Sequence, residues 1–224
     1  FPPGTTEDTV RQVFAQIDAA SKELGIAVTG GHTEVTSAVT QPVVIGDMHG
    51  VVDKDRLVTS SGARPGDLVV MTKTAGIEGT SILAAEKATE LRSHLDESLR
   101  QEAVRLRHAP GISVVKEALL AAEYGTTAMH DPTEGGIAMG LYELATASAV
   151  GLTLDLDAIP ILPVTQTICR FFHLNPLGLI SSGTLLLTVP PDRWPTLQSV
   201  FQSAGITARE IGTARQDRGI NAFS

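Results

Sequence analysis

Short strand-like runs alternate with helical segments along the chain, and this alternation restricts the fold more than any other feature of the sequence. Runs of branched and apolar residues predict strands at 26–29, 42–52, 68–72, 126–129, 151–157, 184–189 and 208–212. Apolar residues at helical spacing predict helices at 7–24, 80–91, 92–107, 111–124, 132–145, 164–172 and 195–204. Because hairpin-like pairs of strands also occur, we expect an α+β or a mixed α/β fold rather than an all-parallel sheet.

The first predicted helix carries signals at both of its ends. Thr6 is a candidate N-cap, and the acidic residues Glu7 and Asp8 suit the positive end of the helix dipole. Gly25 follows the last apolar residue of the pattern, as a C-terminal glycine does. These signals predict a helix that ends at Leu24.

A polar stretch rich in turn residues, from Asp53 to Asp67, separates two parts of the chain. It contains Ser60-Ser61-Gly62 and Arg64-Pro65-Gly66-Asp67, both of which favour turns. Linkers between domains have this composition. We therefore expect one domain over residues 1–60 and a second over residues 61–224.

Charge and hydropathy argue against nucleic acid and membrane as partners. The 224 residues include 17 Lys and Arg against 25 Asp and Glu, for a net charge of −8, and no basic stripe is visible. No apolar run approaches the ~20 residues that a membrane-spanning helix needs. The chain starts with Phe1-Pro2-Pro3-Gly4 rather than Met, so we expect a processed or excised piece of a longer protein.

A single cysteine, Cys169, leaves no partner for an internal disulfide and no thiolate cluster for zinc or iron–sulfur binding. A reducing cytoplasm is the simplest compartment for such a chain. Because Cys169 lies in an apolar helical segment, we expect it to be an inert, buried thiol.

The start of the helix predicted at 132–145 is unusual. Asp131 is suited to the N-cap, Pro132 to the first helical position, and Glu134 to the third position of a capping box. Gly135 and Gly136 are not explained by capping, because each glycine costs roughly 0.8–1 kcal/mol relative to alanine inside a helix. Either a neighbouring strand packs tightly against this backbone, or an anion or metal–phosphate group lies on the helix N-terminus.

Two further glycine-rich stretches follow predicted strands. Residues 30–34 read Gly-Gly-His-Thr-Glu and are either an ordinary glycine turn or a place where side chains bind a ligand. This stretch is neither a P-loop nor a dinucleotide fingerprint. Residues 76–81 form a glycine loop before a helix that Thr80 or Ser81 would cap, and such an N-terminus accepts phosphate or carboxylate.

Histidines offer a second candidate for metal binding. His32, His49 and His130 would form a metal site only if the fold brought them together, because no pair has the spacing of two ligands on one helix face. The alternative is that each is a surface histidine or one satisfied by its neighbours. No Ser/His/Asp motif for nucleophilic catalysis is recognisable, so the catalytic residues stay unknown.

Several of these motifs, taken in order, resemble the aminoimidazole ribonucleotide synthetase superfamily. They are Gly-Gly-His-Thr-Glu-Val at 30–35, Arg-Pro-Gly-Asp at 64–67, the loop at 76–79, His-Asp-Pro-Thr-Glu-Gly-Gly at 130–136, and the segment 175–183. The resemblance runs over essentially the whole chain. Within the superfamily the sequence is most similar to the hydrogenase maturation protein E branch and its synthase-related relatives, and residues 30–33 also resemble selenophosphate synthetase.

This resemblance implies an ATP-dependent enzyme that phosphorylates or dehydrates its substrate and works as a homodimer. Residues 1–60 would be the second half of an N-terminal, nucleotide-binding domain that forms a barrel with its partner. Residues 61–224 would be the α+β C-terminal domain. Because half of the nucleotide cleft is absent, we expect the full-length protein to be a synthetase or dehydratase and this fragment alone to be inactive.

The resemblance also assigns roles to individual residues. The turn that lies along the nucleotide phosphates corresponds to Gly30, Gly31, His32 and Thr33. Asp131 corresponds to an aspartate that reaches the phosphate-bound Mg²⁺, an ion that keeps several waters and takes one or two protein carboxylates. The helix end that faces the nucleotide corresponds to Thr133, Gly135 and Gly136.

Departures from the pattern leave a second function open. Glu134 stands where the hydrogenase-maturation branch often has a basic residue, and the loops at 76–79 and 181–183 differ from its usual sequences. That branch also ends in a cysteine that carries the group to be dehydrated, whereas this chain ends Asn-Ala-Phe-Ser. We therefore do not expect dehydration of its own tail, and the acceptor is unknown. The alternative is a non-catalytic scaffold of the same fold that binds a nucleotide or a small molecule.

Overall fold

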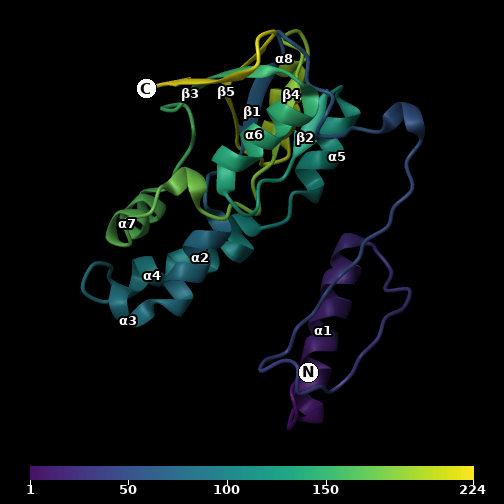
Figure 1. Cartoon of the computed structure of the whole chain (residues 1–224), viewed down its shortest axis with the longest axis vertical. Coiled ribbons are helices and arrows are strands. Elements are labelled where there is room, and N and C mark those ends of the chain that lie inside the picture. Colours follow the sequence, from purple (N-terminus) through teal and green to yellow (C-terminus); the bar gives the residue numbers. More distant parts are fainter. The chain divides into compact units, whose positions relative to one another are not determined.

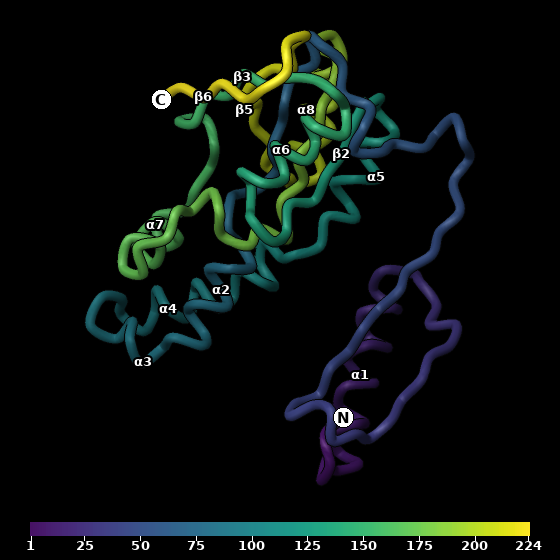
Figure 2. Tube along the Cα trace, viewed as in Figure 1, coloured from purple at the N-terminus to yellow at the C-terminus, as the bar shows by residue number.

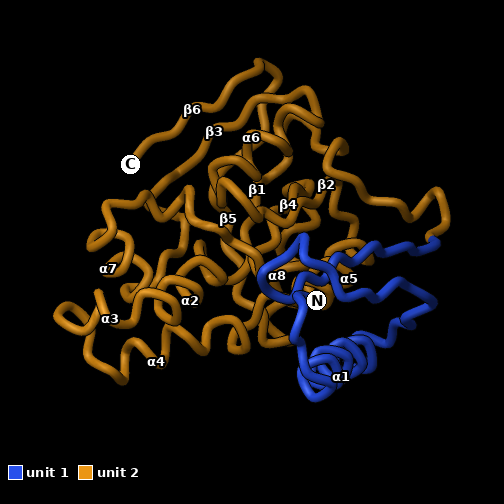
Figure 3. Tube along the Cα trace, turned by 60° about the horizontal axis from the view of Figure 1, so that its bottom comes forward, with its two compact units in different colours: residues 1–51 blue, residues 52–224 orange.

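The computed structural model describes all 224 residues, and the chain divides into two compact units, residues 1–51 and residues 52–224 (Figure 3). The first unit contains one helix, whereas the second contains every strand of the protein. None of the helices combines the length and the hydrophobicity that crossing a bilayer requires.

The first unit is built on α1, Glu7–Leu24. Thr6 caps this helix, because its hydroxyl accepts a hydrogen bond from the Thr9 N–H at 3.3 Å. Gly25 ends the helix in the left-handed conformation, with φ 66°, and its N–H donates to the last turn. The predicted helix and both of its end signals are therefore confirmed.

The rest of the first unit lacks the strands that the sequence predicted. The strands predicted at 26–29 and 42–52 are wrong, since neither run is a strand and Figure 2 traces both as loops. A strand requires a neighbour that accepts and donates its backbone hydrogen bonds, and the two runs form no ladder with each other. Their branched side chains lie in solvent, with Ile45 91% exposed. No half-barrel is formed by residues 1–51.

The second unit contains an open sheet of six strands in the order β2-β4-β1-β5-β3-β6. All neighbours pair antiparallel except β3 and β6, which are parallel. The strands are β1 Leu68–Thr72, β2 Ala128–His130, β3 Gly151–Asp155, β4 Leu186–Val189, β5 Ala208–Arg215 and β6 Gly219–Phe223. The mixed sheet confirms the predicted α+β class. The sequence analysis missed β6, an exposed edge strand without alternating hydrophobicity.

Helices cover both faces of this sheet (Figure 1). On one face α6, Gly136–Ser148, packs over the strands, and on the other α5, Val115–Glu123, and α8, Trp194–Ser203, share a core with β1 and β4. A third apolar cluster joins helices away from the sheet. The helices in this cluster are α2 Ile77–Glu86, α4 Glu97–Arg105 and α7 Pro163–Phe171. The remaining short elements of the second unit are α3 Ala88–Leu91, η1 Lys54–Arg56, η2 Arg107–Gly111 and η3 Pro176–Gly178.

The start of α2 differs from the prediction. The helix begins at Ile77 after Gly76, whose φ is 71°, so Thr80 and Ser81 lie inside the helix and do not cap it. Both side chains are buried and have tertiary partners: the Thr80 hydroxyl bonds the Thr165 hydroxyl at 2.8 Å, and the Ser81 hydroxyl donates to the Val104 carbonyl at 2.8 Å. Tertiary contacts, rather than helix capping, explain these hydroxyl residues.

The Arg-Pro-Gly-Asp motif fixes the start of the central strand. Asp67 is only 5% exposed, and its carboxylate accepts from the Arg64 N–H at 2.9 Å and from the Thr127 hydroxyl at 2.6 Å. Gly66, with φ 95°, donates its N–H to the carbonyl of Ala214. The motif thus ties β1 to the segment before β2 and to β5, which is a structural role.

We predict that Asp67→Ala lowers the free energy of unfolding by about 1–3 kcal/mol, because the Arg64 N–H loses its acceptor and the Thr127 hydroxyl loses one of two. Urea unfolding followed by circular dichroism measures the change. The matched control is Asp192→Ala, which removes an exposed carboxylate and leaves the stability nearly unchanged. Equal stability of the two variants would show that the Asp67 contacts do not hold the strand.

Candidate functional site

Five strand ends meet at one edge of the sheet. Since β4 runs antiparallel to β1 and β2, and β5 antiparallel to β1 and β3, the ends of β1, β2 and β3 lie beside the starts of β4 and β5. The loops that follow or precede these strands therefore collect at this edge. They include three of the stretches that the sequence analysis singled out, at 76–79, 131–136 and 175–183.

Ser181 joins these three stretches. Its hydroxyl is fully buried, accepts from the Gly76 N–H at 2.9 Å and donates to the Leu179 carbonyl at 2.8 Å. Its backbone N–H donates to the carbonyl of Thr133 at 3.4 Å, and the Gly79 N–H donates to the carbonyl of Ile180 at 3.0 Å. We call residues 76–79, 131–136 and 177–183 the glycine-loop cluster. Their contacts confirm that the fold brings these motifs together.

The start of α6 decides between the two explanations for its glycines. Gly135 is the N-cap with φ 79°, and Gly136 has φ 61°, so both occupy the left-handed region that favours glycine. A Cβ on Gly136 would lie 2.5 Å from the Leu179 carbonyl oxygen and 2.6 Å from that of Leu177. Tight backbone packing therefore explains Gly136, although the neighbour is a turn and not the strand that we considered.

The predicted capping box is wrong. Asp131 does not cap α6, and Pro132 and Glu134 precede the helix, because the chain first makes a tight turn in which the Gly136 N–H donates to the Thr133 carbonyl at 3.0 Å. No side chain caps α6, and its first turn contains no acidic residue, so no carboxylate or hydroxyl of the protein is hydrogen-bonded to its positive end. The end of this helix is thus electrostatically suited to an anion.

Asp131, Thr133 and Glu134 are exposed beside this helix end. Hydrogen bonds from its own backbone N–H and from the Thr133 hydroxyl lower the pKa of Glu134. Glu134 is therefore an ionised carboxylate that engages Thr133, one of the residues matched to the nucleotide site. Asp131 makes no ion pair with a protein cation, so its carboxylate is available to a hard cation.

His130 is held from two sides, directly before Asp131. Its Nε2 lies 2.8 Å from the Glu143 carboxylate on α6, and its Nδ1 lies 3.4 Å from the hydroxyl of Ser60. In the first unit, His32 and His49 each lie near a carboxylate of their own. No group of three metal-ligating side chains occurs in the structure.

The residues matched to the phosphate turn lie in the first unit. Gly30 and Gly31 have no heavy atom within 4 Å of a built Cβ, so this conformation does not require glycine at either position. His32 and Thr33 are exposed. A contact between this turn and the glycine-loop cluster stays a prediction.

Cys169 behaves as expected. Its side chain lies in α7 and is 1% exposed, and burial raises the pKa of the thiol. A protonated thiol is a poor nucleophile and a poor metal ligand. The prediction of an inert, buried cysteine is confirmed in its structural part.

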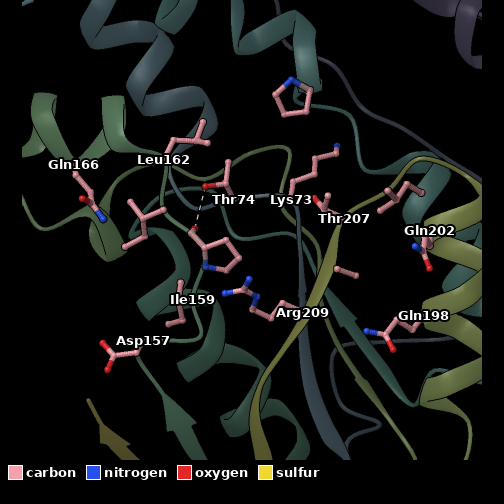
Figure 4. A pocket seen from close by; sticks show the side chains of 15 residues that line it. Lys73, Thr74, Asp157, Ile159, Leu162, Gln166, Gln198, Gln202, Thr207 and Arg209 are labelled. Atoms are coloured by element: carbon pink, nitrogen blue, oxygen red, sulfur yellow. Dashed lines mark hydrogen bonds between the residues drawn. The ribbon is translucent and has the colours of Figure 1, made fainter.

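A groove of about 1010 Å³ opens at the same sheet edge, on the side of β5 and β3 (Figure 4). No sequence motif indicated this groove, because its walls come from several separate segments. Its lining consists of Lys73 and Thr74 after β1, Asp157 and residues 159–162 after β3, residues 206–209 at the start of β5, and Pro110, Gln166, Gln198 and Gln202 from nearby segments.

Lys73 is the better buried of the two cations in this lining. Its Nζ lies 2.8 Å from the Glu117 carboxylate and donates to the Ser113 carbonyl at 2.7 Å, and the two charged side chains are 9% and 4% exposed. Its backbone is left-handed, with φ 54°, which is uncommon for a residue other than glycine. The charge of Lys73 is thus neutralised inside the protein.

Comparison with known proteins identifies relatives of this chain. The model of the AIR synthase related protein, C-terminal domain, matches residues 64–223. The carbamoyl dehydratase HypE of Cupriavidus necator is 29% identical over 217 residues, which make up 93% of this chain and 58% of the relative. The chain therefore spans somewhat more than half the length of this curated relative.

Solved structures agree in fold. Thiamine-monophosphate kinase from Stenotrophomonas maltophilia has a TM-score of 0.75 at 19% identity, over 98% of this chain and 68% of its own. HypE in complex with ATP has a TM-score of 0.70 at 23% identity, over 96% and 62%. HypE also occurs in a HypE–HypF complex, with a TM-score of 0.70 at 21% identity, over 99% and 70%. The resemblance drawn from the sequence motifs is confirmed.

We predict that Gly136→Ala destabilises the protein by more than the roughly 1–2 kcal/mol of a left-handed alanine, because the new Cβ also meets two carbonyl oxygens. Thermal unfolding measures the loss. Gly178→Ala is the control, since no heavy atom lies within 4 Å of its Cβ position. If both variants unfold at the same temperature as the parent, the packing of α6 on the 177–179 turn is not as close as described.

We also predict that Ser181→Ala costs about 1–3 kcal/mol, because the buried N–H of Gly76 loses its acceptor. The exposed Ser203, whose hydroxyl donates to the Ser199 carbonyl, is the matched control and its change to alanine is nearly neutral. Hydrogen exchange should also become faster at residues 76–79 in the Ser181 variant alone. Unchanged exchange at these residues would show that Ser181 does not hold the glycine-loop cluster together.

Proposed function

The chain belongs to the AIR synthase related family, and from this membership we propose that it acts in an ATP-dependent phosphotransfer or dehydration enzyme. We further propose that residues 61–224 are the C-terminal domain of that enzyme. Residues 1–60 would be the second half of its N-terminal, nucleotide-binding and dimerising domain. The relatives named HypE extend the proposal to a role related to hydrogenase maturation.

The observation that carries the proposal is the uncapped N-terminus of α6 beside the unpaired carboxylate of Asp131. A positive helix end favours phosphate, and a carboxylate without a protein partner favours Mg²⁺, so the two features together suit a metal-bound phosphate. We propose that Asp131 ligates the metal. Thr133, Gly135 and Gly136 would shape the helix end that faces the nucleotide.

The phosphate turn of the first unit completes the proposed site. Gly30, Gly31, His32 and Thr33 would lie along the nucleotide phosphates. Because Gly30 and Gly31 have no side chains, the phosphate oxygens can approach their backbone closely, and the side chains of His32 and Thr33 supply hydrogen-bond donors. Support for this part comes from the order of the motifs along the chain.

In the proposed enzyme the protein contributes position and charge. Mg–ATP, when bound, supplies the phosphoryl group that is transferred and the cation that neutralises it. Phosphoryl transfer leaves little covalent work to the protein, so a rigid arrangement of the loops is the main requirement. The buried contacts of Ser181 meet this requirement, because they hold residues 76, 133 and 179 to one another.

Glu134 supports a second candidate, a non-catalytic scaffold that binds a nucleotide or a small molecule. Its ionised carboxylate engages Thr133 and would repel phosphate groups at the end of α6. A domain of this family can keep its fold and a binding surface without turnover. The acceptor of the catalytic form stays unidentified, and a homodimer is part of both proposals.

Calorimetric titration of the full-length protein tests nucleotide binding. We expect Mg–ATP to bind more tightly than about 1 mM, which corresponds to roughly 4 kcal/mol of binding free energy. Asp131→Asn should weaken the binding of Mg–ATP at least roughly tenfold and leave metal-free ATP nearly unaffected, because it removes a metal ligand. Asp192→Asn is the matched control. An absence of Mg–ATP binding at millimolar concentration would refute both functions that involve a nucleotide.

Phosphate release from ATP separates the enzyme from the scaffold. Steady turnover that Asp131→Asn abolishes and Asp192→Asn preserves would support the enzyme. Binding without turnover, in the presence of candidate acceptors, would support the scaffold. Glu134→Arg should then increase the affinity for ATP, because it replaces a repulsive charge with an attractive one.

A further inference from the structure

The groove beside the glycine-loop cluster contains one cation without a partner. Arg209 makes no ion pair and no side-chain hydrogen bond, whereas Lys73 is neutralised by Glu117. In Figure 4 the guanidinium of Arg209 extends from β5 toward the turn that holds Ile159, and Asp157 lies to one side of it. Arg209 is exposed, so an anion in the groove can reach its guanidinium.

The remaining walls of the groove are apolar or carry amides. Pro160, Ile161 and Leu162 are partly exposed and supply apolar surface, and glutamines at its margins supply neutral donors and acceptors. Ligand sites typically combine an apolar lining with a few polar groups that fix orientation. A volume of about 1010 Å³ exceeds the need of a bare inorganic anion. The ligand should therefore have an apolar body in addition to its charge.

The groove and the cluster share one wall. Thr184, next to the cluster, donates its hydroxyl to the Thr74 carbonyl at 2.8 Å, and the Thr74 hydroxyl donates to the Pro160 carbonyl at 3.0 Å. The Ala75 N–H donates to the same Pro160 carbonyl at 2.9 Å. Residues 74–76 thus contact the cluster on one side and the groove on the other, which places the two sites next to each other.

We infer that this groove binds a small organic anion, whose carboxylate or phosphate pairs with the Arg209 guanidinium and whose apolar body covers the partly exposed residues 160–162. The planar guanidinium binds both kinds of anion through two parallel hydrogen bonds. The groove is the acceptor subsite next to the nucleotide; this last assignment rests on the proposed function, whereas the binding of the anion does not.

Titration of the ¹⁵N-labelled 224-residue chain with phenyl phosphate, benzoate and neutral benzyl alcohol tests the inference by NMR, in buffer without metal or nucleotide. The amide signals of Ile159, Ile161 and Leu162 and of residues 206–209 should shift saturably with the two anions and much less with the alcohol. The anion that binds more tightly shows whether the ligand of the groove carries a carboxylate or a phosphate. Equal shifts with benzyl alcohol would overturn the role of charge.

Variants of the same residue sharpen the test. Arg209→Gln should weaken anion binding at least roughly tenfold, whereas Arg209→Lys, which keeps the charge but not the planar fork, should weaken it less. Arg218→Gln is the matched control, because Arg218 is exposed, has no partner and lies in the turn at the other end of β5. Equal affinity of Arg209→Gln and Arg218→Gln would refute the assignment.

The two proposals can fail separately. Anion binding in the groove without Mg–ATP binding to the full-length protein would support the anion site and refute the proposed function. Mg–ATP binding without an effect of Arg209→Gln on anion binding would refute only the anion site. Displacement of phenyl phosphate by Mg–ATP would show that the groove is not a subsite separate from the nucleotide.

Discussion

The buried hydroxyl of Ser181 is the contact on which the arrangement of the loops depends. It satisfies the N–H of Gly76 and the carbonyl of Leu179, two backbone groups that have no strand or helix partner at these points. A buried backbone group without a partner costs about as much as a lost hydrogen bond. The side chain of Ser181 therefore holds the segment after β1 against the segment before β4, and its backbone N–H adds the contact to Thr133. The left-handed glycines at the start of α6 complete this packing, because they let a helix end approach the turn at 177–179.

The sheet determines which loops can meet. β1 lies between β4 and β5, and its neighbours run in the opposite direction, so its end is surrounded by the starts of both. Asp67 and Gly66 fix the other end of the same strand to β5 and to the segment before β2. Residues 73–76, which follow β1, therefore come to lie between the glycine-loop cluster and the groove. Their position follows from strand order, and strand order is a long-range property of the fold.

The sequence predicted local features where no tertiary contact intervenes, and it failed at the starts of α2 and α6, where the side chains and backbone have tertiary partners. The helix α1 and its caps followed from Thr6 and Gly25, because capping is decided within a few residues. The strands expected at 26–29 and 42–52 did not form, because strands depend on partners that hydrophobic runs do not specify. The glycines at 135 and 136 indicated that something approaches the backbone, yet only the structure identified the turn. The groove could not be predicted, since its lining comes from several segments without a common motif.

Charge is divided along this edge of the sheet in a way that suits two anionic ligands. On the cluster side, Asp131 and Glu134 are carboxylates, so a phosphate can approach only with a metal ion or at the positive end of α6. On the groove side, Arg209 and Asp157 both line the walls but form no ion pair with each other, so the guanidinium can attract an anion without a metal. The wall between them contributes no net charge, because the Lys73–Glu117 pair is internally neutral. A metal-bound phosphate donor would thus bind on the cluster side of the wall and a metal-free anionic acceptor on the groove side, so neither ligand would occupy the other's site.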